Sequence, residues 1–329
     1  MSETNGFRAM LAERQRKVGS LLCVGLDPQP EALPYEFMES YGLTEEEIQF
    51  FLTQQSTLNI GSRIAEACGA WMAGIVQSTK DMACLFKPQS AHWEALPGGR
   101  EVMQKLIRGI KSNYPDIPVL LDCKRGDIGR TQARYREAHL GLDGVDGMNF
   151  SPYMGMDCPA ALTDKKYSGH AIVGLCRTSN LRAWEIQDLL LPDGRRFYEY
   201  VAERSLSWFY ELGIMDNAGL VMGAAHETNK LLACPHWTQE QLPPGEIFTE
   251  HFTRVRQIVD DNLWFLIPGV GAQGGFAEAT VRAAWAGYGS IAVNSSSAIS
   301  NASREDDWEE AAAAAARKTR NQLNVGIPS

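Results

Sequence analysis

The sequence PVLLDCKRGDIGRT, residues 118–131, passes from an apolar run directly into alternating carboxylates and an ammonium group. The apolar part predicts a strand. Asp122 and Lys124 are two residues apart, so both side chains point the same way if the strand geometry persists. Asp127 and Thr131 then lie beyond the strand, in the loop and the first turn of a helix. This composition suits a charged active site better than a core.

The charges in this stretch suit chemistry on an anionic substrate. A carboxylate next to an ammonium group stabilises both ionised forms, whereas two carboxylates that face one substrate anion repel it. Such an array can destabilise a substrate carboxylate while it holds a proton ready. The spacing D-x-K-x-x-D alone is also compatible with a solvated salt-bridge cluster after a strand.

Short β-rich runs alternate with longer stretches of amphipathic helical spacing along the chain. The eight predicted strands are residues 21–27, 83–87, 119–122, 147–151, 171–176, 219–223, 264–268 and 291–294. The predicted helical stretches are residues 44–68, 100–113, 128–139, 194–212 and 276–286. Alternating strands and helices imply a parallel sheet, and eight repeats imply a closed (β/α)8 TIM barrel of the α/β class.

The length of 329 residues fits one barrel with insertions, so we predict a single domain over residues 1–329. Within it we predict a short polar N-terminal helix at residues 1–18, a surface excursion at 229–244 and a C-terminal helix at 304–323. The acidic start and basic end of the last helix suit the helix dipole.

Composition and charge restrict the class of protein. A net charge of −9 argues against general binding to nucleic acids or membrane surfaces, although a local positive pocket for a phosphorylated substrate is compatible with it. The seven cysteines form no C-x-x-C pair and indicate reduced thiols. The N-terminal stretch lacks the apolar segment of a signal peptide, and no segment reaches the roughly 18 apolar residues that span a bilayer. We therefore expect a cytoplasmic protein.

Nearly every predicted strand ends in a polar residue. These positions are Asp27, Lys87, Asp122, Ser151 and, just beyond the fifth strand, Thr178. Each one alone could serve as a helix cap or a turn residue. Because such barrels carry their chemistry at the carboxyl ends of the strands, the joint placement predicts one site.

A glycine-rich loop, IPGVGAQGG at residues 267–275, follows the seventh predicted strand. Its backbone N–H groups are accessible to a phosphate, and the loops after strands seven and eight are the usual phosphate site of these barrels. A tight turn without a ligand is the alternative. We predict phosphate contacts at Gly269, Gly271 and Gly274.

The extended pattern Asp-x-Lys-x-x-Asp-Ile-x-x-Thr, which begins at Asp122, resembles the signature of orotidine 5'-monophosphate decarboxylases, and DCKRGDIG looks like the longer bacterial (type 2) form of that family. Similar segments follow one another in order along nearly the whole chain. They are LCVGLD at 22–27, FKPQ at 86–89, SPY at 151–153, LCRTSN at 175–180 and PGVG at 268–271. The resemblance implies decarboxylation of orotidine 5'-monophosphate to UMP in de novo pyrimidine biosynthesis, without a metal or a cofactor.

The resemblance also implies roles for single residues. Lys124 would protonate C6 of the pyrimidine as carbon dioxide leaves, and Asp122 would lie against the substrate carboxylate. Lys87 would hold Asp122 and the ribose, in a Lys-Asp-Lys-Asp array that Asp127 completes. Asp27 would bind the ribose hydroxyls.

Further contacts follow from the same resemblance. Thr178 would contact the pyrimidine ring, and Gln273 would contact the phosphate or the base. Asp127, with Ile128 and Thr131, would reach into the site of the neighbouring subunit, so the active unit would be a homodimer.

The sequence departs from the family pattern after the eighth predicted strand. Residues 294–299 read NSSSAI where the family has Asn-Ser-Ser-Arg, so Ser297 occupies the position of the phosphate-binding arginine. A serine hydroxyl supplies one donor in place of a bidentate guanidinium. We expect weaker binding of the phosphorylated substrate unless another cation, such as Arg304 or Arg177, reaches the site.

Two other functions remain open on the sequence. A metal-dependent sugar-phosphate decarboxylase of the same superfamily shares Asp-x-Lys-x-x-Asp, and a non-catalytic nucleotide-binding paralogue is compatible with the lost arginine. The six histidines lack a metal-site spacing such as H-E-x-x-H, and no dinucleotide-binding G-x-G-x-x-G follows the first strand. Lys87 and the continuous Lys-Arg-Gly-Asp-Ile-Gly run favour the nucleotide enzyme.

Overall fold

The computed structural model describes residues 6–54, 58–231, 234–238, 245–271 and 275–328. Its centre is an eight-stranded parallel sheet. The strands are β1 (Leu22–Leu26), β2 (Leu85–Pro88), β3 (Leu120–Arg125), β4 (Gly147–Phe150), β5 (Ala171–Arg177), β6 (Gly219–Met222), β9 (Trp264–Ile267) and β10 (Ile291–Ser295). All eight predicted strands are therefore confirmed, with small shifts at their ends.

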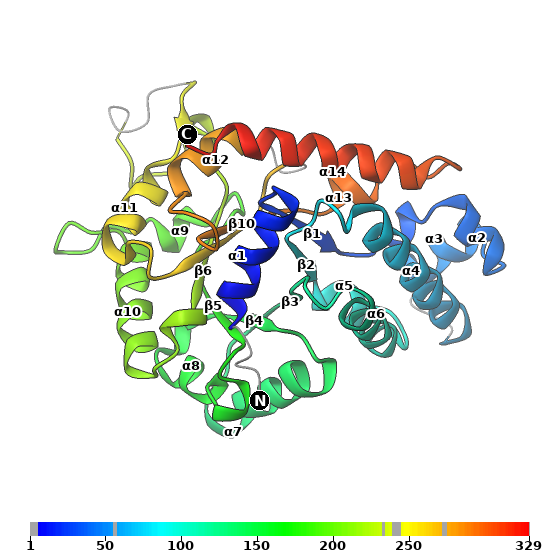
Figure 1. The fold of residues 1–329 in the computed structure, drawn as a ribbon, viewed down its shortest axis with the longest axis horizontal. Helices are drawn as coiled ribbons and strands as arrows, with labels where there is room; N and C mark the ends of the chain where they lie inside the picture. Colours follow the sequence, from blue (N-terminus) through cyan, green and yellow to red (C-terminus); the bar gives the residue numbers. More distant parts are fainter. Residues whose placement is uncertain (1–5, 55–57, 232–233, 239–244, 272–274, 329) are drawn as a thin grey trace.

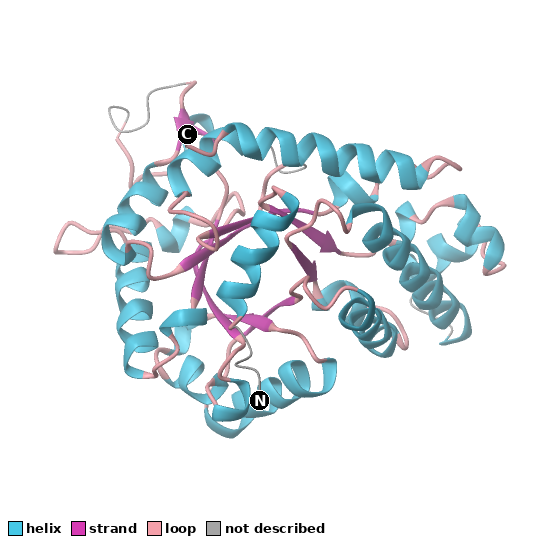
Figure 2. Ribbon diagram, in the orientation of Figure 1, coloured by secondary structure: helices cyan, strands magenta, loops and turns pink. Residues whose placement is uncertain are grey.

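The sheet closes into a barrel. Its strands are hydrogen-bonded in the order β2-β1-β10-β9-β6-β5-β4-β3. Parallel bridges between Phe86 and Val119 and between Gln89 and Asp122 join β2 to β3, the two ends of this order. Figure 2 shows the strands as a central ring that helices surround. The (β/α)8 TIM barrel predicted from the sequence is confirmed.

Helices cover the outside of this ring (Figure 1). The longer ones are α4 (Leu58–Thr79), α6 (Gly99–Asn113), α10 (Phe197–Glu211), α11 (Glu250–Val259), α12 (Ala277–Ala284) and α14 (Trp308–Val325). They bury apolar faces against strands that are themselves buried almost throughout, so the main core lies between the barrel and its helices.

Two helical predictions need correction. The stretch 44–68 is not one helix, because α3 (Glu45–Gln54) and α4 (Leu58–Thr79) are separate elements. Arg63 Nη2 in α4 lies 2.8 Å from Glu47 Oε1 in α3, whereas the 16 positions between them would span about 24 Å along one straight helix, so the two helices pack side by side. The stretch 128–139 is divided as well, since α7 (Gly129–Arg136) leads into a π-helical turn, η2 (Glu137–Asp143).

The N-terminal helix α1 (Phe7–Val18) lies across the amino-terminal end of the barrel. The ring of Phe7 stacks on that of Trp264, with centroids 5.2 Å apart. Gln15 Nε2 donates a hydrogen bond of 2.7 Å to the carbonyl of Ile291, at the start of β10. Helix α1 therefore covers the amino-terminal end of the barrel and leaves the carboxyl ends of the strands uncovered. Of the predicted helix 1–18, residues 1–5 lie outside the described part of the chain.

At the other terminus, α14 begins at Trp308 where the sequence predicts position 304, and it ends at Val325. The residues before it pack on the start of α2 (Tyr35–Ser40) instead of continuing the helix: Tyr35 N donates to the carbonyl of Arg304 at 3.0 Å.

The predicted excursion 229–244 lies partly outside the described residues. The two-stranded antiparallel pair of β7 (His226–Glu227) and β8 (Ile247–Phe248) joins the two ends of the segment that contains it. Cys234, Trp237 and Phe248 are buried together in a small apolar cluster. Trp237 Nε1 donates to Asp188 Oδ2 at 2.9 Å, so this part of the excursion packs against the segment between β5 and α10.

The seven cysteines are all described, and each is a buried free thiol. Burial raises the pKa of Cys84 and of Cys123 to about 12. Among the described residues, no helix combines the length and the apolar character needed to cross a membrane.

Candidate active site

A cavity of about 600 Å³ opens at the carboxyl ends of the strands. Seven of the residues predicted for the site line it: Asp27, Lys87, Asp122, Lys124, Thr178, Gly269 and Ser297. They come from six strands, β1, β2, β3, β5, β9 and β10, and the loops that follow them. The structure therefore brings together side chains that are far apart in the sequence, at the end of the barrel where such folds carry chemistry.

Three charged groups form the centre of this cavity. Lys87 Nζ lies 3.0 Å from Asp122 Oδ2, and Lys124 Nζ lies 2.5 Å from Asp122 Oδ1. Lys87 is 2% exposed, whereas the side chain of Lys124 is 46% exposed. One ammonium group is thus buried as a fixed positive charge, and the other reaches into the open space where a substrate can meet it.

The pKa values follow from this arrangement. Burial alone disfavours the Asp122 carboxylate, but the ammonium groups of Lys87 and Lys124 outweigh it, so the pKa of Asp122 lies well below its usual range. Burial likewise disfavours the Lys87 ammonium, but Asp122 and Asp27 raise the pKa of Lys87 above its usual range. Both groups stay ionised at neutral pH, as an electrostatically preorganised site requires.

Asn149, in β4, is a site residue that the sequence reasoning missed. Its Nδ2 donates to Asp122 Oδ1 at 2.8 Å, and its Oδ1 accepts from the backbone N–H groups of Cys123 and Lys124 at 2.8 and 2.7 Å. The available signal was an asparagine within the otherwise apolar strand Gly147–Phe150, where a buried amide needs partners.

The backbone of Lys124 departs from strand geometry. Its φ is +45°, in the left-handed region that residues other than glycine rarely adopt. The pairing register between β3 and β4 also shifts between Leu121 and Arg125, the stretch that contains Lys124. Asp122 and Lys124 therefore do contact each other, as expected, but the backbone between them does not have the regular strand geometry on which that expectation was based.

Asp27, just after β1, offers an acceptor to the cavity. Its Oδ1 is buried and has no hydrogen-bond partner among the described residues. A buried carboxylate oxygen without a donor is costly, so a hydroxyl group of a ligand would stabilise it. Other polar side chains that line the cavity, and that were not among the predicted site residues, are Gln29, Gln89, His92, Ser179, Asn180, Gln187, Asn294 and Ser296.

Thr178 is held in place by its neighbours in the loop after β5. Its backbone N–H donates to Gln187 Oε1 at 2.8 Å, and Gln187 Nε2 donates back to Thr178 Oγ1 at 2.8 Å. Asn180 Oδ1 accepts from the same hydroxyl at 2.6 Å. Together, these three residues form one polar wall of the cavity.

The predicted phosphate side is only partly described. Gly269 and Gly271 have φ of 104° and 91°, values that glycine adopts readily and other residues do not. Gly269 lines the cavity, whereas Gly271 does not. Gln273 and Gly274 lie outside the described residues. Ser297 lines the cavity at the start of α13 (Ser297–Ser300).

The two cations considered as partners for the phosphate are engaged elsewhere. Arg177 is buried and donates to both carboxylate oxygens of Asp188, at 2.9 and 3.1 Å. Arg304 donates to the carbonyl of Leu33 at 3.1 Å and lies 3.2 Å from Glu45. Neither lines the cavity that contains Ser297.

Besides Gly271, four predicted residues do not line the cavity of their own chain. Asp127 Oδ1 accepts from the backbone N–H of Ile128 at 2.8 Å, and the Ile128 side chain is 48% exposed. Thr131 is exposed on α7. Ser151 is paired by its backbone N–H to the carbonyl of Arg125 at 2.8 Å. Ile128 and Thr131 are thus exposed, and Asp127 beside them is half-buried.

A closed barrel with a lysine–aspartate–lysine array at the carboxyl ends of its strands defines a class of protein: a (β/α)8 barrel enzyme with a charged cavity suited to proton transfer on an anionic substrate. Within the described part of the chain, no group of three or more His, Cys, Asp or Glu side chains has the arrangement of a metal site.

Comparison with known proteins specifies the family. Residues 20–314 match the family model described as "Orotidine 5'-phosphate decarboxylase / HUMPS family". The orotidine 5'-phosphate decarboxylase of Ralstonia pickettii is 37% identical over 322 residues, which cover 97% of this chain and 98% of that protein. That of Variovorax paradoxus is 36% identical over 326 residues, which cover 98% of this chain and 99% of that protein.

Solved structures agree with this match. The structure of Leishmania donovani OMP decarboxylase is similar with a TM-score of 0.69 and 26% identity, over 98% of this chain and all (100%) of that one. The chain therefore belongs to the orotidine 5'-phosphate decarboxylase family and is an enzyme of its carboxy-lyase type. The family's reaction is the decarboxylation of orotidine 5'-monophosphate in pyrimidine biosynthesis.

Proposed function

We propose that this chain converts orotidine 5'-monophosphate to UMP without a metal or cofactor, with Lys124 as the proton donor. The observation that carries the proposal is the contact of Asp122 with both Lys87 and Lys124 inside the cavity. The bond between C6 and the carboxylate carbon breaks, carbon dioxide leaves, and the electron pair remains on C6. Lys124 then transfers one proton to C6 and is reprotonated by solvent.

Asp122 supplies the driving force in this proposal. Its carboxylate is held ionised beside the position of the substrate carboxylate, so the two like charges repel in the ground state. That repulsion is relieved as carbon dioxide departs, while the ammonium groups of Lys87 and Lys124 stabilise the charge that develops on C6. Groups fixed before the reaction favour the transition state over the ground state.

Substrate binding is assigned to the remaining wall of the cavity. Asp27, whose buried Oδ1 lacks a partner among the described residues, would accept from a ribose hydroxyl. Thr178 would contact the pyrimidine. The phosphate would bind at Gly269 and Ser297, where a serine in place of the family arginine provides a weaker contact.

The site is proposed to be shared between two copies of the chain. Asp127, Ile128 and Thr131 lie beside their own cavity without lining it, which is compatible with a reach into the partner's cavity. Lys124→Ala and Asp127→Ala test this arrangement by complementation. If the sites are shared, mixed dimers of two inactive variants regain one intact site, and an equal mixture recovers about a quarter of the wild-type activity. Recovery of none would contradict a shared site.

The two rival functions predict other results. A metal-dependent sugar-phosphate decarboxylase would lose activity in a chelator, and a non-catalytic nucleotide-binding paralogue would bind UMP without turnover. The names of the relatives that are 36–37% identical favour the nucleotide enzyme. Buried free thiols fit the reducing cytoplasm, in which we propose that the enzyme acts as a single-domain barrel.

The deciding experiment follows the loss of orotate absorbance with and without a chelator. Wild type should turn over in both conditions, Lys124→Ala should show no measurable turnover, and Lys318→Ala should match wild type because Lys318 is exposed on α14. Ser297→Arg should raise kcat/KM about tenfold or more, since a hydrogen bond to a charged group contributes about 1.5–3 kcal/mol. An unchanged kcat/KM in Ser297→Arg would refute the phosphate assignment, and an inactive wild type would refute the function.

A further inference from the structure

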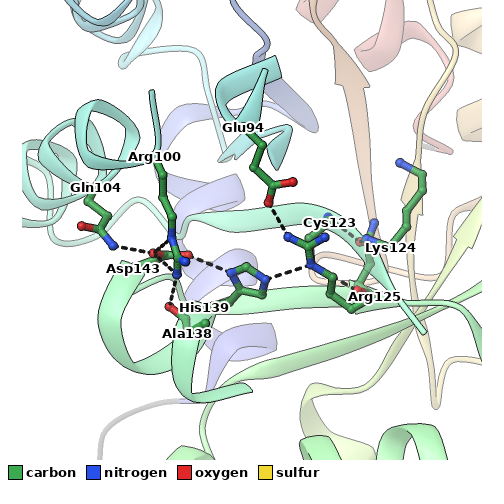
Figure 3. Close-up of polar contacts among 10 residues, drawn as sticks. Glu94, Arg100, Gln104, Cys123, Lys124, Arg125, Ala138, His139 and Asp143 are labelled. Atoms are coloured by element: carbon green, nitrogen blue, oxygen red, sulfur yellow. Dashed lines mark hydrogen bonds and ion pairs between the residues drawn. The ribbon is translucent and has the colours of Figure 1, made fainter. Parts of the chain in front are cut away.

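A chain of polar contacts runs outward from the residue that follows Lys124 (Figure 3). Arg125 Nε donates to His139 Nε2 at 3.1 Å, and His139 Nδ1 lies 2.8 Å from Asp143 Oδ2. Asp143 is fully buried and also accepts from Arg100 at 3.1 Å and Gln104 at 2.7 Å. Five side chains from β3, α6 and the π-helical turn η2 thus form one connected network.

The donors and acceptors in this network fix the state of the histidine. Because Arg125 Nε carries a hydrogen, His139 Nε2 must offer a lone pair to accept it. The single ring proton is then on Nδ1 and is donated to Asp143. The imidazole is neutral and bridges a cation and an anion. The carboxylate is suited to this role, since hydrogen bonds from His139 and Gln104 outweigh burial and hold the pKa of Asp143 below its usual range.

The second observation is the strain at Lys124. A left-handed φ in a residue other than glycine costs about 1–3 kcal/mol and persists only where neighbouring contacts impose it. On the N-terminal side, Asn149 Oδ1 holds the N–H groups of Cys123 and Lys124. On the C-terminal side, the contacts belong to Arg125.

Arg125 is fixed from several directions. Its carbonyl accepts from Ser151 N at 2.8 Å, its guanidinium pairs with Glu94, and its Cζ lies 4.8 Å from the centroid of the Tyr135 ring. His139 stacks on the same ring, with centroids 6.1 Å apart. These contacts therefore hold the Arg125 side chain and backbone in place, and with them the peptide bond between Lys124 and Arg125.

We propose that the Asp143–His139–Arg125 network is a positioning device that holds Lys124 in its strained conformation, with the ammonium group on Asp122. Its members do not touch the substrate and act through the backbone between residues 124 and 125. The π-helical turn supports the assignment, because such turns are frequent at functional sites and this one carries both His139 and Asp143. The proposal rests on the proposed role of Lys124 in catalysis.

His139→Leu removes both hydrogen bonds, and His139→Gln can restore one donor and one acceptor. We expect His139→Leu to lower kcat roughly ten- to a hundredfold with KM within about twofold, an effect of the size known for residues that orient the ligands of a metal site. His139→Gln should recover part of kcat. Gln15→Leu is the matched control, since Gln15 is equally buried and hydrogen-bonded but lies at the opposite end of the barrel.

A further measurement separates positioning from a general loss of stability. Amide hydrogen exchange of residues 123–125, measured without substrate, should become at least about tenfold faster in His139→Leu and stay unchanged in Gln15→Leu.

The outcomes are distinct. A kcat in His139→Leu within about twofold of wild type, or a loss equal to that in Gln15→Leu, would overturn the proposal. Unchanged exchange at residues 123–125 would overturn it as well. If wild type fails to decarboxylate orotidine 5'-monophosphate, the proposed function fails, but the exchange measurement still decides whether the network holds this turn.

Discussion

Replacing Lys87 by methionine tests the energetics of the buried pair. Lys87 is 2% exposed, and its ammonium lies 3.0 Å from Asp122 Oδ2. Methionine keeps most of the aliphatic volume but removes the charge. Breaking a buried ion pair in this way costs about 3–5 kcal/mol, because one charge is left uncompensated. Lys124 still pairs with Asp122, so we expect the lower end, a loss of about 3 kcal/mol in the free energy of unfolding.

The pH dependence of this loss follows from the two pKa directions. The pKa of Asp122 is lowered by folding, so its contribution is complete above the ordinary value of 3.8 and is lost as the pH falls through the folded value. The pKa of Lys87 is raised by folding, so its contribution is complete below 10.5 and is lost as the pH rises through the folded value. The gap between wild type and Lys87→Met should therefore be the same at about pH 5 and about pH 8.

Urea unfolding followed by tryptophan fluorescence measures the gap, at one protein concentration, because the stability of the proposed dimer would depend on concentration. Lys17→Met is the matched control: Lys17 lies 2.7 Å from Asp116, but its side chain is 65% exposed, so the pair should contribute less than about 1 kcal/mol. Equal losses in the two variants, or a gap that changes between these pH values, would refute this account of the Lys87–Asp122 pair.

Three shorter predictions concern neighbouring groups. Asn149→Leu should lower kcat about tenfold with little change in KM, because Asp122 and the turn at Lys124 lose their shared hydrogen-bond partner; steady-state kinetics would contradict this if only KM changed. Asp27→Ala should raise KM in the same assay and leave kcat nearly unchanged, as expected for a contact made equally in ground and transition states. The thiols should react with an aromatic disulfide reagent only after denaturation, since burial raises the pKa of several of them, including Cys84, to about 12; rapid reaction of the folded protein would contradict their burial.

The sequence was sufficient for the barrel because each strand is a short apolar run between turn residues, and such patterns are local. It was also sufficient for the charged centre, since Lys87 and Asp122 stand at strand ends that closure of the barrel must bring together. It was not sufficient for Asn149, because nothing local tells which side of β4 faces the neighbouring strand end. The left-handed φ of Lys124 also cannot be predicted from the two-residue hydrophobic repeat, because that repeat assumes a regular strand and Lys124 interrupts it.

The order of the strands around the barrel also separates chemistry from phosphate binding. Lys87, Asp122 and Lys124 are carried by β2 and β3, whereas Gly269 and Ser297 follow β9 and β10. In the closed ring, β1 lies between β2 and β10, and it carries Asp27 at its end. A change at Ser297 should therefore leave the contacts of Asp122 intact and act through the binding of the substrate phosphate. Binding energy from the phosphate, far from the reacting carbon, can stabilise the transition state relative to free enzyme and substrate. Ser297→Arg should therefore change kcat/KM without changing the groups that transfer the proton.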